Sequence, residues 1–391
     1  MSRARKITVL GATGSVGLAT LDLIERAPAG QFEVMALTAN RNVEELTRQA
    51  LKFRPQLAVV ADPACAGALK EALAGSGVAT ASGPEAVVQA AQMEADWVMA
   101  AIVGSVGLMA TAAALHDGRT LAIANKECLV CAGALFMETA QQRGATVLPV
   151  DSEHNAIFQA LYAPHRKFVD RITLTASGGP FRDWSRERMR DVTPSQALAH
   201  PVWEMGDKIS IDSATMMNKG LEIIEACRLF DLPASRVNVV VHPQSIIHGL
   251  VEYTDGSVLA QMGSPDMRIP IAATLAWPNR MSTPAERLDL ATIGRLDFEQ
   301  PDMEQFPALR VAREAMESGE GATSALNASN EVAVAAFLEG RIGFLDIVSL
   351  VSRTLDSLTA SDALPARLTA FEEALDIDTQ ARGIASALID R

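Results

Sequence analysis

Short apolar runs alternate with helical patterns along the first 150 residues. The runs predict buried strands, and the stretches between them repeat apolar positions every three or four residues, as in Gly17–Arg26 and Val43–Phe53. The predicted strands are Lys6–Leu10, Phe32–Thr38, Leu57–Ala61, Trp97–Val103, Thr120–Ala124 and Thr146–Val150. Strands that alternate with helices are typical of a parallel sheet covered on both faces. We therefore expect residues 1–150 to form an α/β domain with a Rossmann-like, doubly wound parallel sheet.

The pattern changes after residue 150 and indicates an α+β catalytic domain over residues 151–276. A helix is expected from about Ala214 to Phe230, before the turn at Asp231. The strands expected in this region, the last two forming a hairpin, are Arg171–Ala176, Asn238–His242, Ser245–Tyr253 and Ser257–Met262.

The rest of the chain predicts a linker and a helical domain. Residues 277–305 contain three prolines and few long periodic runs, so we expect a linker there. Residues 306–391 are rich in alanine, leucine and valine at helical spacing and should form a C-terminal helical bundle. Its expected helices are Ala308–Ser318, Asn327–Glu339, Phe344–Leu358 and Leu368–Leu388.

Composition narrows the class of protein. The 391 residues are 49% hydrophobic and carry a net charge of −13 without a basic run, so a nucleic-acid partner is not expected. Four cysteines are too few for a disulfide scaffold. The uncharged stretch Trp97–Leu115 is interrupted by Gly104 and Gly107, which favours a strand, a turn and a helix over a membrane span. We expect a soluble cytoplasmic protein.

A glycine-rich loop follows the first predicted strand and precedes a helix. Glycines there let the backbone approach a pyrophosphate, and the helix start adds amide donors. A tight turn without a ligand is the alternative. The second strand ends in Asn40, Arg41 and Asn42, without the carboxylate that usually binds the ribose of NAD, and Arg41 can pair with a 2′-phosphate. The sequence therefore predicts NADPH as cofactor.

Two carboxylates follow the last predicted strand of the first domain. Side chains alternate along a strand, so Asp151 and Glu153 should point the same way off its end. Like charges held together repel unless a cation lies between them, and a hard divalent cation prefers oxygen ligands. A solvated acidic loop is the alternative.

Two more polar segments follow predicted strands. Asn125, Lys126 and Glu127 come after the fifth strand, where ligands of doubly wound sheets bind, although a simple helix start would look the same. Ser177 begins a Ser-Gly-Gly-Pro turn whose exposed amides suit an anion, although an ordinary turn is an alternative.

The segment from Asp212 to Glu222 concentrates polar groups on an otherwise apolar helix. Asp212 or Ser213 can cap it, while Asn218 and Glu222 are four residues apart and share a face beside Lys219. One of these groups can hold a phosphate and another a metal, although a polar helix face is the alternative.

A loop near residues 200–208 suits a lid over a bound ligand. It begins at His200, is bounded by Pro201 and Gly206, and carries Trp203 and Met205. Core packing of Trp203 is the alternative. His248, in the predicted hairpin, can reach the same site.

Taken in order, these motifs resemble the 1-deoxy-D-xylulose 5-phosphate reductoisomerase family over essentially the whole chain. The matching segments are GATGSVG, ANKE, PVDSEHN, SGGPFR, HPVWEMG, DSATMMNKGLE and HPQSIIH. The resemblance implies a homodimeric enzyme that uses NADPH and one Mg²⁺ or Mn²⁺ per subunit to rearrange and reduce a sugar phosphate. Family members often have glycine where Asn40 stands and serine where Ala12 stands, which leaves detail at the 2′-phosphate pocket open.

The resemblance also implies residue roles. The metal ligands would be Asp151, Glu153 and Glu222. The cofactor would contact Gly11, Thr13, Gly14, Ser15, Val16, Gly17, Asn40, Arg41, Asn42, Asn125, Glu127 and Gly206. The substrate would contact Lys126, Ser152, Glu153, Ser177, His200, Trp203, Met205, Ser213, Asn218, Lys219 and Glu222, with Glu153, Lys126, His200 and His248 as the catalytic candidates.

Two other functions fit part of the pattern. An aldehyde or semialdehyde dehydrogenase would need a nucleophilic cysteine in the second domain, and Cys227 is the candidate. A non-catalytic NADPH-sensing module would have no need for three carboxylates and a lysine in one pocket.

Overall fold

The structure, a computed structural model, describes residues 3–203 and 205–390. The chain divides into two compact units, and each draws on separate stretches of sequence. The first contains the chain up to Asn125, together with Phe136–Asp151 and Met267–Ala285. The second contains Lys126–Leu135, Ser152–Asp266 and the chain from Glu286 onward.

A seven-stranded parallel sheet forms the centre of the first unit, in the order β4-β3-β2-β1-β5-β6-β7. Its strands are β1 (Arg5–Leu10), β2 (Phe32–Ala39), β3 (Leu57–Val60), β4 (Ala79–Ser82), β5 (Trp97–Ala100), β6 (Thr120–Ile123) and β7 (Thr146–Pro149). The six predicted strands are present, and the Rossmann-like fold class is confirmed. The sequence did not predict β4, because this short edge strand of alanine, threonine and serine carries no apolar run.

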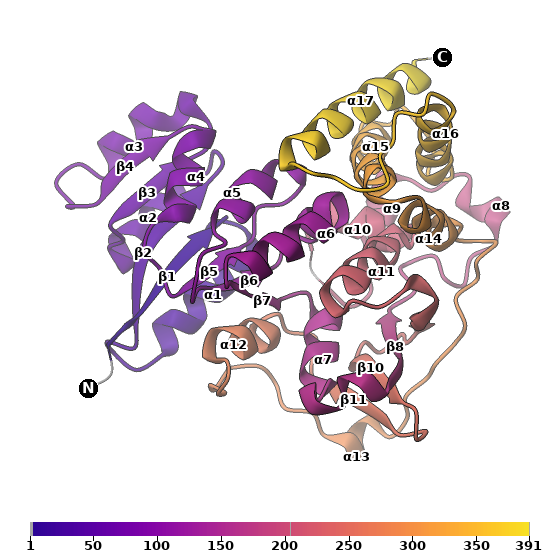
Figure 1. Ribbon diagram of the computed structural model, residues 1–391, viewed down its shortest axis with the longest axis horizontal. Helices are drawn as coiled ribbons and strands as arrows, with labels where there is room; N and C mark the ends of the chain where they lie inside the picture. Colours follow the sequence, from indigo (N-terminus) through magenta and orange to yellow (C-terminus); the bar gives the residue numbers. More distant parts are fainter. Residues whose placement is uncertain (1–2, 204, 391) are drawn as a thin grey trace. The chain divides into compact units, whose positions relative to one another are not determined.

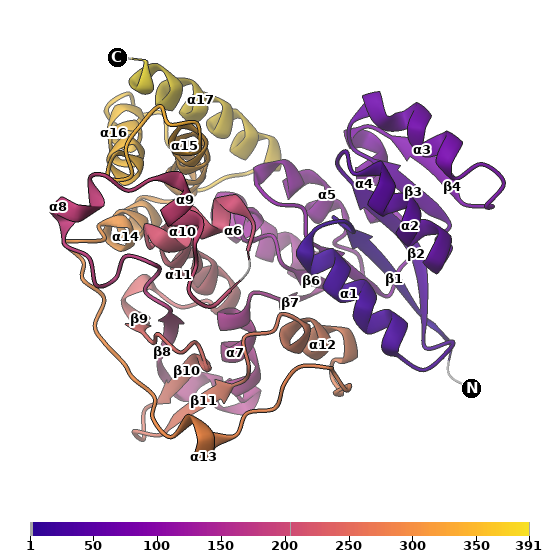
Figure 2. The same ribbon diagram turned by 180° about the vertical axis from the view of Figure 1, so that it is seen from behind.

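Helices cover both faces of this sheet (Figure 1). One face shares a single apolar core with α1 (Ser15–Arg26), α2 (Val43–Phe53), α3 (Ala66–Ala72) and α12 (Arg268–Ala276). Figure 2, seen from behind, shows α1 lying across the strands on this side. The helices α4 (Pro84–Gln92) and α5 (Leu108–Ala113) pack on each other, and α4 contacts the strands β1 to β4.

Helix α6 (Lys126–Gln142) is broken at Ala132, where φ is −143° and ψ is 36°. A break frees backbone amides that need new acceptors. The buried carboxylate of Glu320 provides one, accepting from the N–H of Ala134 at 2.8 Å and of Leu135 at 3.4 Å. The first part of α6, which starts at Lys126, is thereby fixed to the C-terminal helices of its own unit.

The second unit contains a four-stranded mixed sheet in the order β11-β10-β8-β9. Its strands are β8 (Val169–Ala176), β9 (Val237–Val241), β10 (Ile247–Tyr253) and β11 (Val258–Met262). Only β8 and β9 pair in parallel; the other pairings are antiparallel, including the predicted hairpin. The helix α7 (Ser152–Ala160) packs on β10 and β11, and α11 (Met217–Phe230) packs on β8 and β9.

The single helix predicted from Ala214 to Phe230 is wrong at its start. Two helices, α10 (Asp207–Ala214) and α11, meet at Met216, whose φ of 62° is left-handed. Methionine rarely adopts this conformation, so local sequence does not predict the break.

Four long helices at the C-terminus pack on one another, as the sequence predicted (Figure 1). They are α14 (Ala308–Ser318), α15 (Glu320–Leu338), α16 (Asp346–Ala360) and α17 (Phe371–Ile389). Shorter helices occur at α8 (Arg186–Met189), α9 (Pro194–Leu198) and α13 (Leu290–Ile293). Among the described residues, no helix is both long and apolar enough to span a membrane.

Candidate active site

The glycine loop of the first unit is shaped by close backbone packing. A Cβ on Gly17 would lie 2.3 Å from the carbonyl oxygen of Gly11, so only glycine fits there. Gly11 has a φ of 86° and donates its N–H to Thr38 Oγ1 at 3.0 Å, which ties the loop to the end of β2. Gly14 is the N-cap of α1, and it is exposed together with Ser15. The loop therefore presents the amide end of a helix to solvent, as a pyrophosphate site requires.

The predicted 2′-phosphate residues lie beside this loop, at the end of β2. Arg41 is 77% exposed and its Nε is 2.6 Å from Asp62 Oδ2. Hydrogen bonds from the Ala64 amide and from Arg41 lower the pKa of Asp62, so this carboxylate is ionised. Asn42 caps α2 by accepting from the Glu45 N–H, and Asn40 is exposed. The guanidinium is thus held at the rim of the loop by a surface ion pair.

Replacing Arg41 with alanine is expected to reduce the preference for NADPH over NADH. Loss of a charged hydrogen bond to a phosphate costs roughly 1.5–3 kcal/mol, or about 10- to 100-fold in affinity. Titration of both cofactors against wild type and variant measures the ratio. An unchanged ratio would show that Arg41 does not contact the 2′-phosphate.

Two lysines and two carboxylates meet in the second unit. Glu222 is 1% exposed. Its Oε1 faces Lys126 Nζ at 3.3 Å and also accepts from the Asn218 amide, while its Oε2 accepts from Lys219 Nζ. Lys219 Nζ donates as well to Glu153 Oε1 at 2.9 Å. The predicted contact between Asn218 and Glu222 across one turn of helix is therefore present.

The three predicted metal ligands converge. One carboxylate oxygen each of Asp151, Glu153 and Glu222 lies within 4.8 Å of the others. Asp151 is the residue after which α7 begins, and Glu153 lies in the first turn of α7. The argument that Asp151 and Glu153 alternate along a strand is therefore wrong. Strand β7 ends at Pro149, before both residues, and the first turn of α7 sets the separation of their side chains. Three oxygen donors fit a hard divalent cation such as Mg²⁺ or Mn²⁺.

Ser177 and Ser213 lie on segments that pack closely together. A Cβ on Gly179 would lie 2.8 Å from the Ser213 carbonyl oxygen, so a glycine is needed where the loop after β8 meets α10. Ser177 Oγ accepts from the Gly179 N–H at 3.2 Å, and His200 Nε2 is 3.0 Å from the same oxygen. The Ser177 hydroxyl thus lies beside a backbone amide of the turn, as expected for an anion site.

The state of His200 follows from its partners. Its Nδ1 accepts from the backbone N–H of Val202 at 3.2 Å and of Trp203 at 2.9 Å, so the proton resides on Nε2 and is donated to Ser177. Burial lowers the pKa of His200, consistent with this neutral form. The imidazole thus fixes both the serine and the start of the predicted lid.

Trp203 lies over His248. Their ring centroids are 6.3 Å apart, and His248 Nε2 faces the Gly263 carbonyl oxygen at 3.2 Å. Burial lowers the pKa of His248 as well. Met205 is half-buried and Gly206 is the N-cap of α10, whereas residue 204 of the predicted lid lies outside the described residues. The structure thus places Trp203 next to His248, and Trp203 is only partly buried, so it is not a core residue.

The predicted cap at Asp212 or Ser213 is wrong, because both lie inside α10, whose N-cap is Gly206.

Asp212 instead forms an ion pair with Lys208, which also binds Glu127. Burial opposes ionisation, yet Lys208 lowers the pKa of Glu127, while Asp212 and Glu127 raise the pKa of Lys208. The sequence analysis assigned no role to Lys208. Its position four residues before Asp212 could have predicted their ion pair, because residues at this spacing share one face of a helix.

The predicted cofactor residues divide between the units. Asn125 belongs to the first unit, where its side-chain amide donates to the Gly104 carbonyl oxygen at 3.1 Å and closes the loop after β5. Glu127 and Gly206 belong to the second unit.

Cys227 does not suit the role of a dehydrogenase nucleophile. It is 4% exposed within α11, and burial raises the pKa of its thiol to about 11. A reactive cysteine needs an accessible thiolate, so the dehydrogenase alternative has no nucleophile at this position.

A dinucleotide-type glycine loop and a carboxylate–lysine cluster together define a metal-dependent, nicotinamide-linked oxidoreductase. The comparisons identify which one. Family models match residues 7–133 (1-deoxy-D-xylulose 5-phosphate reductoisomerase), 147–230 (its C-terminal domain) and 262–384 (DXP reductoisomerase C-terminal domain). The chain belongs to the 1-deoxy-D-xylulose 5-phosphate reductoisomerase family.

Individual relatives agree over the full length. The reductoisomerase of Rhodospirillum centenum is 57% identical over 385 residues, which cover 98% of this chain and 94% of that protein. The Zymomonas mobilis enzyme in complex with NADPH is 54% identical, with a TM-score of 0.92 and 99% of each chain covered. A DOX-P reductoisomerase in complex with NADPH, fosmidomycin and magnesium is 44% identical, with a TM-score of 0.95 and coverage of 99% and 98%.

Proposed function

We propose that the protein converts 1-deoxy-D-xylulose 5-phosphate into 2-C-methyl-D-erythritol 4-phosphate with NADPH and a divalent cation, in non-mevalonate isoprenoid precursor synthesis. The observation that carries the proposal is the convergence of Asp151, Glu153 and Glu222 beside Lys126 and Lys219, in a chain that matches the family throughout. Neither a dehydrogenase nor a non-catalytic NADPH sensor would require this cluster of carboxylates and lysines.

The three carboxylates would hold the metal. Together with Lys126 and Lys219 they leave one net negative charge, which a divalent cation would offset. A cation held there would polarise the substrate carbonyl and stabilise negative charge on its oxygen. Lys219 contacts both Glu153 and Glu222, so it links two of the proposed ligands.

The substrate would be oriented through its phosphate. Ser177, Ser213, Asn218 and Lys219 offer two hydroxyls, an amide and an ammonium group, which suit a phosphate dianion. Lys126 and Ser152 flank the carboxylates and suit the sugar oxygens. His200, held neutral by its partners, can donate from Nε2, and closure of the loop that carries Trp203 would exclude water.

NADPH would bind the first unit and supply the hydride that reduces the rearranged aldehyde. Its pyrophosphate would lie at the start of α1, and its 2′-phosphate at Arg41. The test is oxidation of NADPH in the presence of the deoxyxylulose phosphate and Mg²⁺ or Mn²⁺. No oxidation with metal present would overturn the proposal.

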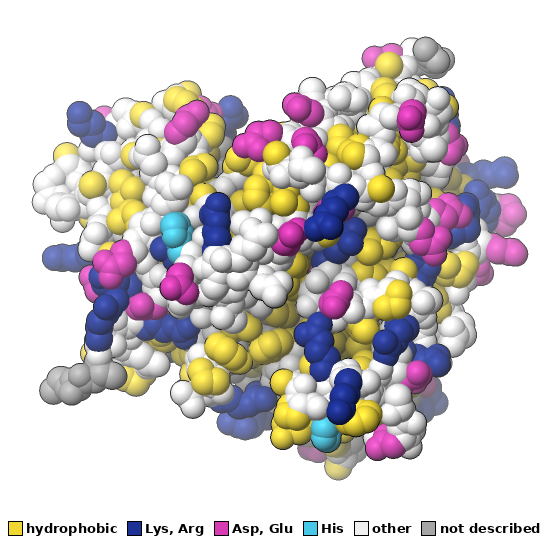
Figure 3. Space-filling model, viewed as in Figure 1, with side chains coloured by type: hydrophobic (Ala, Val, Ile, Leu, Met, Phe, Trp, Pro, Cys, Tyr) yellow, Lys and Arg dark blue, Asp and Glu magenta, His cyan; other side chains and the backbone are white. Residues whose placement is uncertain are grey.

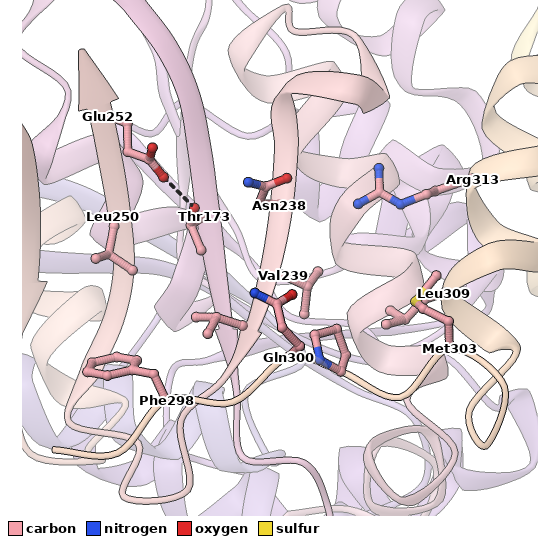
Figure 4. Close-up of a pocket in the computed structure, with 12 residues that line it drawn as sticks. Thr173, Asn238, Val239, Leu250, Glu252, Phe298, Gln300, Met303, Leu309 and Arg313 are labelled. Atoms are coloured by element: carbon pink, nitrogen blue, oxygen red, sulfur yellow. Dashed lines mark hydrogen bonds between the residues drawn. The ribbon is translucent and has the colours of Figure 1, made fainter. Parts of the chain in front are cut away.

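We propose that the active form is a homodimer built on the second unit. The sheet face opposite α7 and α11 is lined by strand residues and by the segment around Phe298 (Figure 4). Phe298 is 46% exposed there, and Val258 on the edge strand β11, which pairs with Glu252 and shares its face of the sheet, is 52% exposed. The same face carries the acidic Glu252 and the basic Arg313, as a surface that pairs with a second copy of itself requires. An edge strand with exposed apolar residues is usually covered.

Val258→Lys is expected to yield a monomer, because Val258 pairs with Glu252 on the proposed face and a charge placed in an apolar interface is not compensated. Light scattering after gel filtration gives the mass. Leu51→Lys, on α2 and 49% exposed, is the matched control and should stay dimeric. A monomeric wild type, or a dimeric Val258→Lys, would contradict this surface.

The proposed partners are small molecules and a second copy of the chain. Acidic and basic side chains are interspersed over the face shown in Figure 3. The four cysteines are present as thiols, which suits the reducing cytoplasm proposed as the site of the reaction.

A further inference from the structure

A chain of polar side chains connects the C-terminal helix α15 to the start of α6. Asn330 on α15 is 0% exposed, and its Nδ2 donates to Asp212 Oδ1 at 2.7 Å. The other oxygen of Asp212 faces Lys208 Nζ at 3.0 Å, and Lys208 Nζ donates to Glu127 Oε1 at 3.0 Å. All four residues belong to the second unit.

The link between Asn330 and Asp212 is costly to break. Asp212 is 1% exposed, and a buried carboxylate is tolerated only when its oxygens receive hydrogen bonds. Asn330 donates to one oxygen and Lys208 to the other, so the two partners together fix the orientation of the carboxylate. Asn330 is therefore the neutral donor that leaves Lys208 free to bind Glu127 as well.

Two members of this series of polar side chains adjoin residues of the proposed substrate site. Asp212 directly precedes Ser213 in α10, and Glu127 directly follows Lys126 in α6. A change in the position of Asp212 would move Ser213 with it, since both lie in the last turns of one short helix.

We propose that Asn330 is a positioning residue for substrate binding. It orients Asp212 and, through Lys208, Glu127, so that Ser213 and Lys126 face the substrate. The inference rests on the proposed function and deepens it, because it gives the C-terminal helices a part in holding the phosphate.

Asn327 supplies a matched control. It lies one turn earlier on α15 and is also 0% exposed, but its Nδ2 donates to Glu331 Oε1 at 3.0 Å. Leucine has the same number of side-chain heavy atoms as asparagine and the same branching at Cγ, so Asn330→Leu and Asn327→Leu each remove one buried amide from the same helix.

The expected result is a selective effect on the Michaelis constant. Asn330→Leu should raise KM for 1-deoxy-D-xylulose 5-phosphate about tenfold, as loss of a buried charge-assisted hydrogen bond does, with a smaller change in kcat. Asn327→Leu should leave KM at the wild-type value. NADPH affinity, measured by titration, should be retained in both, since the glycine loop belongs to the first unit. Equal KM values in the two variants would overturn the inference.

A double-mutant cycle distinguishes action through Asp212 from a general structural role, because it measures whether the two effects on KM are additive. If Asn330 acts through Asp212, the variant Asn330→Leu/Asp212→Asn should raise KM no more than the larger single change does. Additive effects would mean that Asn330 acts by another route. If Asn330→Leu shows no cooperative melting, Asn330→Ser, whose shorter hydroxyl does not reach Asp212, replaces it. Wild-type turnover of the substrate tests the proposed function separately.

Discussion

Replacing Glu222 with glutamine should abolish most of the activity, lowering kcat/KM by about 10³-fold. The side chain is buried and accepts hydrogen bonds from Lys126, Asn218 and Lys219, so the neutral variant leaves two ammonium groups without their shared counter-charge. Breaking a buried ion pair costs roughly 3–5 kcal/mol, and about 1.4 kcal/mol corresponds to a factor of ten. The same change removes one proposed metal ligand. Steady-state kinetics under saturating Mg²⁺ measure the loss.

A matched control separates this effect from general destabilisation. Asp378→Asn neutralises another buried carboxylate, which pairs with Arg382 on α17. It should melt at a lower temperature yet keep the wild-type kcat. NADPH titration of Glu222→Gln should give the wild-type dissociation constant, because the glycine loop is untouched. Near-normal turnover by Glu222→Gln would rule out its proposed role.

Removing divalent metal from the wild-type protein is expected to lower turnover at least 100-fold. The carboxylates alone carry negative charge and cannot polarise a carbonyl, whereas a bound cation supplies several kcal/mol of charge stabilisation. Addition of Mg²⁺ or Mn²⁺ in excess of the chelator should restore the rate. NADPH binding should persist throughout, measured by cofactor fluorescence, because a pyrophosphate at a helix start needs no metal. Full activity after chelation would show that the carboxylate cluster has another purpose.

Much of the fold follows from periodicity alone. The strands of the first unit and helices such as Val43–Phe53 and Ala308–Ser318 lie where their apolar spacing predicts. The misses have local physical causes. Strand β4 is short and weakly apolar, and the break at Met216 places a left-handed backbone where local sequence predicts a continuous helix.

The candidate site was predictable as a set of residues, but its geometry was not. The sequence placed Asp151, Glu153 and Glu222 together by resemblance, and the structure brings their oxygens within reach of one cation. The contact between Lys126 and Glu222 depends on how α6 and α11 approach each other, and no pattern along the chain records that. Lys219, by contrast, is three residues from Glu222 in the same helix. The link from Asn330 to Asp212 spans 118 residues, so only tertiary structure reveals it.

The most direct test of the account is the identity of the product. Wild-type protein incubated with 1-deoxy-D-xylulose 5-phosphate, NADPH and Mg²⁺ should yield 2-C-methyl-D-erythritol 4-phosphate, one molecule per NADPH oxidised, as identified by NMR spectroscopy. Glu153→Gln should bind NADPH but form almost none. An unbranched alcohol phosphate, formed by reduction without rearrangement, or no product at all, would contradict the account.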